Sequence, residues 1–333
     1  MAKISIGIVG LPNVGKSTLF NALTKKSVPA ENYPFCTIDP SVGVIAVPDE
    51  RLEKLNEFSK SKKKIPAVVE FVDIAGLVRG ASKGEGKGND FLQHIRECDA
   101  IAEVVRIFED GEILHVEGKV DPLSDIETIN LELILKDLET VTKRLGSLEK
   151  DVKRGDKEAI EEKEELEKAK QTLESEKFIG KDFKIKSLQL LTQKPVLYVL
   201  NTSAVSENFN IENLLKIENS KLEINNYVEV DPIFEKGLDD LIKKAYETLD
   251  LVTFFTTGED ETRGWTIQRG STAPIAGTAI HNDFKDKFIR AEVIEWDKLL
   301  EAGSYAKARE YGWLRTEGKE YVVKDGDVVE FKI

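Results

Sequence analysis

The residues with the clearest chemistry are the eight from Gly10 to Ser17, which read G-L-P-N-V-G-K-S. They match the phosphate-loop pattern G-x-x-x-x-G-K-S, in which backbone N–H groups surround the phosphates of a nucleotide. Lys16 is placed to reach the outer phosphates, and the Ser17 hydroxyl is placed to ligate magnesium. An apolar, strand-like run precedes the loop and a helical pattern follows it. This context predicts that the chain binds a nucleoside triphosphate.

Two further groups follow the loop in the order that switch-type NTPases use. Thr37, within Pro34–Pro40, can supply a second hydroxyl ligand to magnesium from a switch loop. Asp73 follows the apolar run Val68–Val72 and can hold the magnesium shell, while the amide of Gly76 can face the γ-phosphate. The order and spacing of these residues predict a P-loop NTPase of the switch type that uses Mg²⁺.

The composition is that of a globular protein without a general affinity for polyanions. The chain has 333 residues, 41% of them apolar and 33% charged, with a formal net charge of −13. This charge argues against nonspecific binding of nucleic acid over the whole surface, but it leaves room for a local basic face. Two cysteines give no disulfide framework. The early first strand and the lack of an apolar stretch of about 18 residues predict neither a signal peptide nor a membrane span.

The hydrophobic pattern predicts an α/β nucleotide domain. Strands and helices alternate over residues 1–123, which is typical of a mostly parallel sheet covered on both faces. The pattern returns at Lys194–Asn201, whose last residue stands where this fold places its base-reading loop, and ends in a helix over Gly237–Leu249. The expected strands are Ile4–Val9, Ser41–Val47, Ala67–Asp73 and Ala100–Phe108, and the expected helices are Lys16–Leu23, Glu50–Ser59 and Asn89–Glu97.

A helical insertion interrupts this domain. Apolar residues recur at alternating steps of four and three, which is typical of a coiled-coil seam. Gly155–Asp156 breaks the pattern, so two helices are expected to fold back as an antiparallel hairpin over residues 124–179. The expected seam residues are Ile134, Leu138, Val141, Leu145, Leu148 and Val152, then Ile160, Leu166 and Leu173.

Short strands and tight turns predict a small mixed sheet over residues 251–333. The expected strands are Val252–Thr256, Gly264–Ile267, Phe288–Val293 and Val328–Ile333, with a short helix at Thr278–Phe284. The expected domains are therefore a nucleotide domain of residues 1–123 and 180–250, the inserted hairpin of 124–179, and the small domain of 251–333.

Long signatures resemble the YchF family of Obg-like ATPases over essentially the whole chain. They are Gly10–Ser17, Asn32–Pro40 and Asp73–Asn89, which continues into Phe91–Arg96. Residues 251–333 resemble the family's TGS domain, a ubiquitin-like β-grasp, through Phe254–Gly258 and Ala279–Phe284. The resemblance implies a cytoplasmic, ATP-preferring P-loop NTPase that associates with the ribosome (its large subunit) or rRNA. The ribosome is implied by the family alone.

Residue chemistry and the resemblance together nominate the site. Leu77 stands where many switch GTPases carry a Gln that orients the attacking water. The resemblance therefore points to His94 for that role. The alternative is that His94 is an ordinary histidine on the surface of a helix. An asparagine at the position of Asn13 helps to coordinate K⁺ in related proteins, or it shapes its own turn. The nominated nucleotide-binding residues are Asn13, Val14, Gly15, Lys16, Ser17, Thr18, Asn201 and Thr202; the catalytic residues are Lys16, Gly76 and His94; the metal ligands are Ser17, Thr37 and Asp73.

The base-reading loop departs from the known patterns. Switch GTPases read guanine with Asn-Lys-x-Asp, and the family usually has Asn-x-x-Glu, but this chain has N-T-S-A over Asn201–Ala204. Guanine selectivity is therefore expected to be weak, although Asn201 and the Thr202 backbone can contact adenine. The family's Ser-Ala-type loop, expected near Leu222–Tyr227, is poorly matched, and the loop before Gly237 is short.

Basic residues gather at Lys25–Lys26 and Lys60–Lys64. These clusters are either solvated loops or contacts to rRNA phosphates.

The sequence as a whole predicts an ATPase that forms ADP and phosphate and acts as a switch in translation or stress response. Two alternatives stay open: an Obg-type GTPase, and a nucleotide-gated ribosome-binding module with negligible turnover, motivated by Leu77. No membrane or DNA partner is expected.

Overall fold

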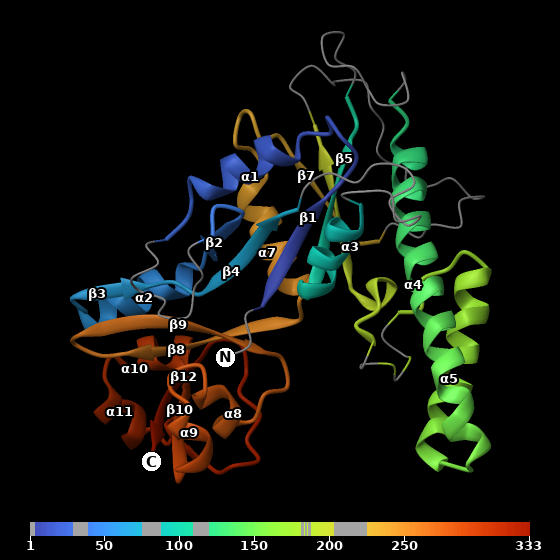
Figure 1. Cartoon of the computed structure of the whole chain (residues 1–333). Coiled ribbons are helices and arrows are strands. Elements are labelled where there is room, and N and C mark those ends of the chain that lie inside the picture. Colours follow the sequence, from blue (N-terminus) through green and yellow to red (C-terminus); the bar gives the residue numbers. More distant parts are fainter. Residues whose placement is uncertain are drawn as a thin grey trace. The chain divides into compact units, whose positions relative to one another are not determined.

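Figure 1 shows the computed structural model of the chain, which describes residues 4–28, 39–74, 88–108, 120–180, 183, 185, 188–202 and 225–333, except for the side chains of 88–90. The chain forms two compact units. Unit 1 gathers residues 24–70 and 242–333, and unit 2 gathers residues 5–23 and 71–241.

Unit 2 is built on a parallel sheet, as the sequence predicts. Strand β1 (Ser5–Val9) pairs with β5 (Ala100–Arg106), β5 with β6 (Val196–Asn201), and β6 with β7 (Tyr227–Val230). The second half of β4 (Val68–Asp73) flanks β1, so the strand order is β4-β1-β5-β6-β7. Strands β1 and β5 are buried along their whole length, which fits their largely apolar sequences. The helices α1 (Lys16–Thr24), α3 (Gly88–Glu97) and α7 (Leu238–Thr248) match the predicted ones within a residue.

Strand β7 was not expected, and it changes the interpretation of the preceding loop. The Ser-Ala-type loop was placed near Leu222–Tyr227, but Tyr227 opens β7, and residues 222–224 lie outside the described part of the chain. The carboxyl end of β7 is instead followed by a turn, Asp231–Lys236, that leads to α7.

The helical insertion is present as two antiparallel helices, α4 (Pro122–Lys153) and α5 (Lys157–Glu174), drawn in green in Figure 1. The side chain of Asp156 accepts the N–H groups of Glu158 and Ala159, which caps α5 directly after the break. The seam packs as predicted except at one position: Ile160 is 37% exposed, and Ala159 is buried in its place. Among the described helices, none is both long and apolar enough to cross a membrane.

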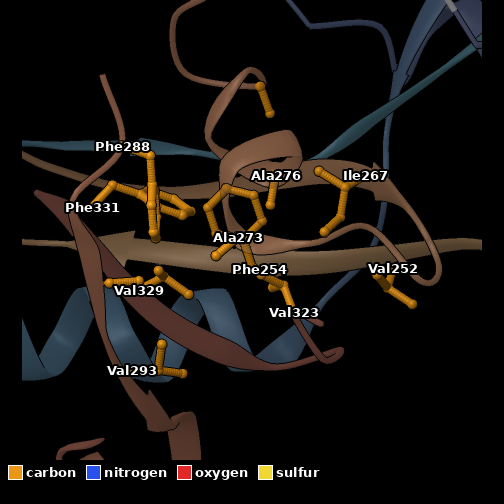
Figure 2. Close-up of a cluster of buried hydrophobic side chains, with 12 residues drawn as sticks. Val252, Phe254, Ile267, Ala273, Ala276, Phe288, Val293, Val323, Val329 and Phe331 are labelled. Atoms are coloured by element: carbon orange, nitrogen blue, oxygen red, sulfur yellow. The ribbon is translucent and has the colours of Figure 1, made fainter. Parts of the chain in front are cut away.

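Unit 1 contains a mixed sheet with the strand order β11-β10-β12-β8-β9-β3. Its core contains three phenylalanines, Phe254, Phe288 and Phe331, which meet among smaller aliphatic side chains, as Figure 2 shows. The remaining bounds are β2 (Val42–Ala46), α2 (Glu50–Ser59), β3 (Lys63–Ile65), β8 (Leu251–Thr257), β9 (Glu261–Gln268), α8 (Ala273–Gly277), α9 (Asp283–Asp286), β10 (Arg290–Glu295), α10 (Trp296–Ala302), α11 (Tyr305–Glu310), β11 (Arg315–Glu317) and β12 (Asp327–Lys332).

Two expectations for this unit are wrong. The single helix expected at Thr278–Phe284 is replaced by α8 and α9. A Cβ at Gly277 would come within 2.7 Å of the Phe284 Cβ, so the chain turns back on itself at this glycine. The lysine-rich segment is not only a loop, since Lys63–Ile65 forms β3 beside β9. Nearby, Lys62 and Lys64 are ion-paired with Asp260 and Glu53.

One buried acid on β5 has no partner. The Glu103 side chain is 1% exposed, and neither of its carboxylate oxygens accepts a hydrogen bond in the described structure. Burial raises the pKa of Glu103 well above its usual value, and the negative charge of Asp125 on α4 raises it further. Burial therefore favours the protonated form of Glu103, where α4 covers the sheet.

This acid makes stability depend on pH. Above about pH 4.3 the unfolded chain releases the proton of Glu103, whereas the folded protein keeps it. The contribution of this proton to the free energy of unfolding is therefore complete below that pH. It decreases by up to about 1.4 kcal/mol per pH unit as the pH rises toward the pKa of the folded state. We therefore expect the stability of Glu103→Gln, relative to the parent chain, to increase between ~pH 5 and ~pH 8 in urea titrations. A stability difference between Glu103→Gln and the parent chain that stays constant with pH would contradict this. The control is Glu161→Gln on α5, whose side chain is exposed and whose stability difference should not change with pH.

Candidate nucleotide-binding site

The loop Gly10–Ser17 joins β1 to α1 in a conformation that requires its glycines. Gly10 has a φ of +153°, and a Cβ there would lie 2.7 Å from the Val104 carbonyl oxygen. Gly15 has a φ of +100°, in the region that favours glycine. Asn13 also takes a positive φ of 65°, which fits its role as a loop-shaping residue. The backbone is thus held in the curved form that surrounds phosphates.

A side chain from β6 fastens this loop to the sheet. The Nδ2 of Asn201 donates a hydrogen bond of 2.8 Å to the carbonyl of Val14, and both residues are buried. A Cβ at Gly15 would lie 2.3 Å from the same nitrogen, so only glycine allows the asparagine to approach. The structure therefore brings Asn201 to the phosphate loop, where one N–H of its amide holds the loop; its contact with a base stays a prediction.

Lys16 is a desolvated cation. Its side chain is buried, and its Nζ donates to the carbonyl of Leu11 at 2.7 Å. Burial lowers the pKa of Lys16 to about 8, an effect that the negative charge of Asp73 partly opposes. An anionic phosphate would replace the solvation that this ammonium lacks. The site is thus electrostatically suited to phosphate.

Two of the three oxygen donors nominated for magnesium, Ser17 and Asp73, belong to the described part of the chain. Asp73 ends β4, and burial raises the pKa of its carboxyl while Lys16 lowers it. Ser17 and Thr18 occupy the first turn of α1 with exposed side chains. A carboxylate and a hydroxyl are hard oxygen ligands of the kind that Mg²⁺ prefers, so these donors fit that ion. Thr37 and Gly76 lie outside the described residues.

The remaining nominated residues occupy two different settings. His94 lies exposed on α3, and Phe91, Leu92 and Ile95 of the same helix are buried. Thr202 follows β6, and both its N–H (2.8 Å) and its hydroxyl (3.2 Å) donate to the carbonyl of Val230. Both donors of Thr202 are therefore engaged within the protein.

Sequence reasoning missed Arg106, which ends β5 directly beside Asn201 in the sheet register. Its side chain is fully buried, its Nε donates to the Phe108 carbonyl at 3.0 Å, and its guanidinium lies 4.7 Å from the Phe108 ring centroid. The available signal was a charged residue at the end of a strand whose other residues, apart from Glu103, are apolar. Arg106 fixes the chain where it leaves the sheet next to the site.

A parallel sheet with this loop between its first strand and helix, a buried lysine that opens the helix and an aspartate at the end of the neighbouring strand defines a P-loop NTPase. Family models agree with this class. One described as "50S ribosome-binding GTPase" matches residues 5–144, and one named for the carboxyl-terminal part of the YchF GTPase, described as "Protein of unknown function (DUF933)", matches residues 251–333.

Whole-chain relatives identify the family. The "Ribosome-binding ATPase YchF" of Bacillus subtilis is 50% identical over 99% of both chains, and the "Obg-like ATPase 1" of rice is 43% identical over 99% of this chain and 92% of the other. The solved structure of the Schizosaccharomyces pombe YchF GTPase aligns with a TM-score of 0.87 at 38% identity, covering 100% of this chain and 98% of that one. The chain belongs to the YchF family, and the predicted fold class is confirmed.

The bond between Asn201 and Val14 gives a direct test. Asn201→Ala leaves a buried carbonyl unsatisfied, which should cost about 1–3 kcal/mol of stability and weaken nucleotide binding, because the loop is no longer held. Asn226→Ala is the matched control, since the Nδ2 of Asn226 donates at the same 2.8 Å to Val196 at the other end of β6. Because this bond is only partly buried, Asn226→Ala should cost less stability than Asn201→Ala, and it should leave nucleotide affinity unchanged. Equal losses of affinity in both variants, measured by calorimetry, would contradict this role.

Proposed function

We propose that this chain is a ribosome-binding ATPase that hydrolyses ATP to ADP and phosphate and uses the nucleotide state as a switch. The observation that carries the proposal is the phosphate loop with its desolvated Lys16 beside Asp73. The names of the whole-chain relatives from bacteria and rice, which are called ATPases, support it.

Within this proposal the catalytic residues and the metal ligands have separate tasks. Lys16 and the loop amides bind the β- and γ-phosphates, and the Gly76 amide contacts the γ-phosphate. Ser17, Thr37 and Asp73 would hold Mg²⁺, which would supply positive charge against the phosphate oxygens. His94 orients the attacking water. K⁺ near Asn13 is an additional proposed activator, and the left-handed backbone of Asn13 fits the loop-shaping alternative equally well.

Base preference is a separate part of the proposal. The bacterial and rice relatives are named ATPases, whereas the fission-yeast structure is titled a GTPase. This chain lacks the lysine and aspartate that read guanine after Asn201. We therefore propose ATP as the substrate, with an Obg-type GTPase as the alternative.

The partner follows from the names of the relatives and of the family model over residues 5–144, which mention the ribosome and its 50S subunit. We propose the large subunit as the docking partner, a cytoplasmic location and a role in translation or stress response. The three expected domains, with boundaries near residues 124, 180 and 251, would divide nucleotide binding from partner contacts.

Two measurements test this function. Phosphate release from ATP should exceed that from GTP, and it should be higher in K⁺ than in Na⁺. The release should be lost in Lys16→Ala. In His94→Ala it should fall at least tenfold, as expected when a residue that acts on the attacking water is removed. Co-sedimentation with ribosomes should differ between ATP and ADP. Nucleotide-dependent ribosome binding without phosphate release would favour the gated binding module. Equal ribosome binding in both nucleotide states would overturn the switch.

A further inference from the structure

Two adjacent apolar side chains stand out on the turn after β7. Ile233 is 69% and Phe234 is 60% exposed, which makes them two of the three most exposed large apolar side chains among the described residues. Adjacent exposed apolar residues commonly mark a binding surface, whereas scattered ones do not.

The turn that carries them is held in one shape. Asp231 and Lys236 exchange two backbone hydrogen bonds of 3.0 Å, which close the turn at its base. The buried side chain of Asp231 accepts the N–H groups of Ile233 and Phe234, both at 3.1 Å. The next residue, Gly237, has a φ of +74°, and a Cβ there would lie 2.2 Å from the Glu229 carbonyl oxygen. The two apolar side chains are therefore displayed by a preorganised turn.

This turn lies at the edge of the sheet that carries the phosphate loop. Val230, the last residue of β7, is opposite Asn201 in the parallel register, and Asn201 contacts the loop through Val14. Neighbouring strands are about 4.8 Å apart, so the turn begins one strand beyond the residue that touches the loop. Open α/β sheets bind ligands along this carboxyl edge.

Part of the polar capacity at this edge is already used. One N–H of the Asn201 amide donates to Val14, and both Thr202 donors point to Val230, which leaves the second N–H and the Oδ1 of Asn201 for other contacts. Beside these groups the turn adds apolar surface, with the Lys236 ammonium 6.0 Å from the Phe234 ring centroid.

We infer that Phe234, supported by Ile233, is the stacking platform for the base of the nucleoside triphosphate held at the phosphate loop. The inference rests on the proposed function and specifies how its site contacts the base. Because every base has a π-face, stacking tolerates both purines and discriminates weakly between them. Selection of ATP over GTP does not come from this contact.

Calorimetric titrations with ATP, GTP and inorganic tripolyphosphate, all with Mg²⁺, test the contact. In Phe234→Ala, ATP and GTP should both bind about 5- to 100-fold more weakly, while tripolyphosphate, which has no base, should bind as to the parent chain. Phe234→Trp should retain affinity for both nucleotides. Ile289→Ala, which removes a comparably exposed (63%) side chain from unit 1, should change nothing.

Unchanged nucleotide affinity in Phe234→Ala would overturn the platform. An equal loss for tripolyphosphate would also overturn it, because the turn would then act through the fold. Lys16→Ala separates this outcome from failure of the proposed function. If the parent chain binds ATP and Lys16→Ala does not, the phosphate site is supported independently of the result for Phe234→Ala. A parent chain that binds no nucleoside triphosphate would overturn both.

Discussion

The bond from the Asn201 amide to the Val14 carbonyl is the constraint on which the site depends. It joins the end of β6 to the loop that connects β1 to α1. It requires a glycine at position 15, because a Cβ there would collide with the Nδ2 of Asn201. The same asparagine lies beside Arg106 on one side and Val230 on the other. One side chain thus sets the position of the loop relative to the strand ends around it.

Two of the buried ionisable groups of unit 2, Lys16 and Glu103, behave in opposite ways. The Lys16 ammonium has lost hydration, and a bound phosphate would replace it, so this desolvation favours binding. Glu103 is buried beneath α4, where no ligand is expected to reach it, and burial favours its protonated form. Perturbed pKa values alone do not mark a binding site, and the position relative to the sheet edge separates the two cases.

The sequence predicted the parts of this molecule that local pattern specifies. The phosphate loop, the buried strands and the break at Gly155–Asp156 each follow from spacing or from residue type. It missed β7, which has only four residues, and β3, whose lysines suggested a loop and which forms only by pairing with β9. It also did not predict the contact of Asn201 with Val14, which joins residues that lie far apart in the chain. Long-range pairing decided each of these cases.

The most direct test is an experimental structure of the chain with Mg²⁺ and a non-hydrolysable ATP analogue. The account predicts the β- and γ-phosphates within hydrogen-bond distance of the Lys16 Nζ and the loop amides. It also predicts a magnesium ion at Ser17 and the base against Phe234, with the bond between Asn201 and Val14 intact. A nucleotide bound elsewhere, or a loop released from Asn201 when the nucleotide binds, would contradict it.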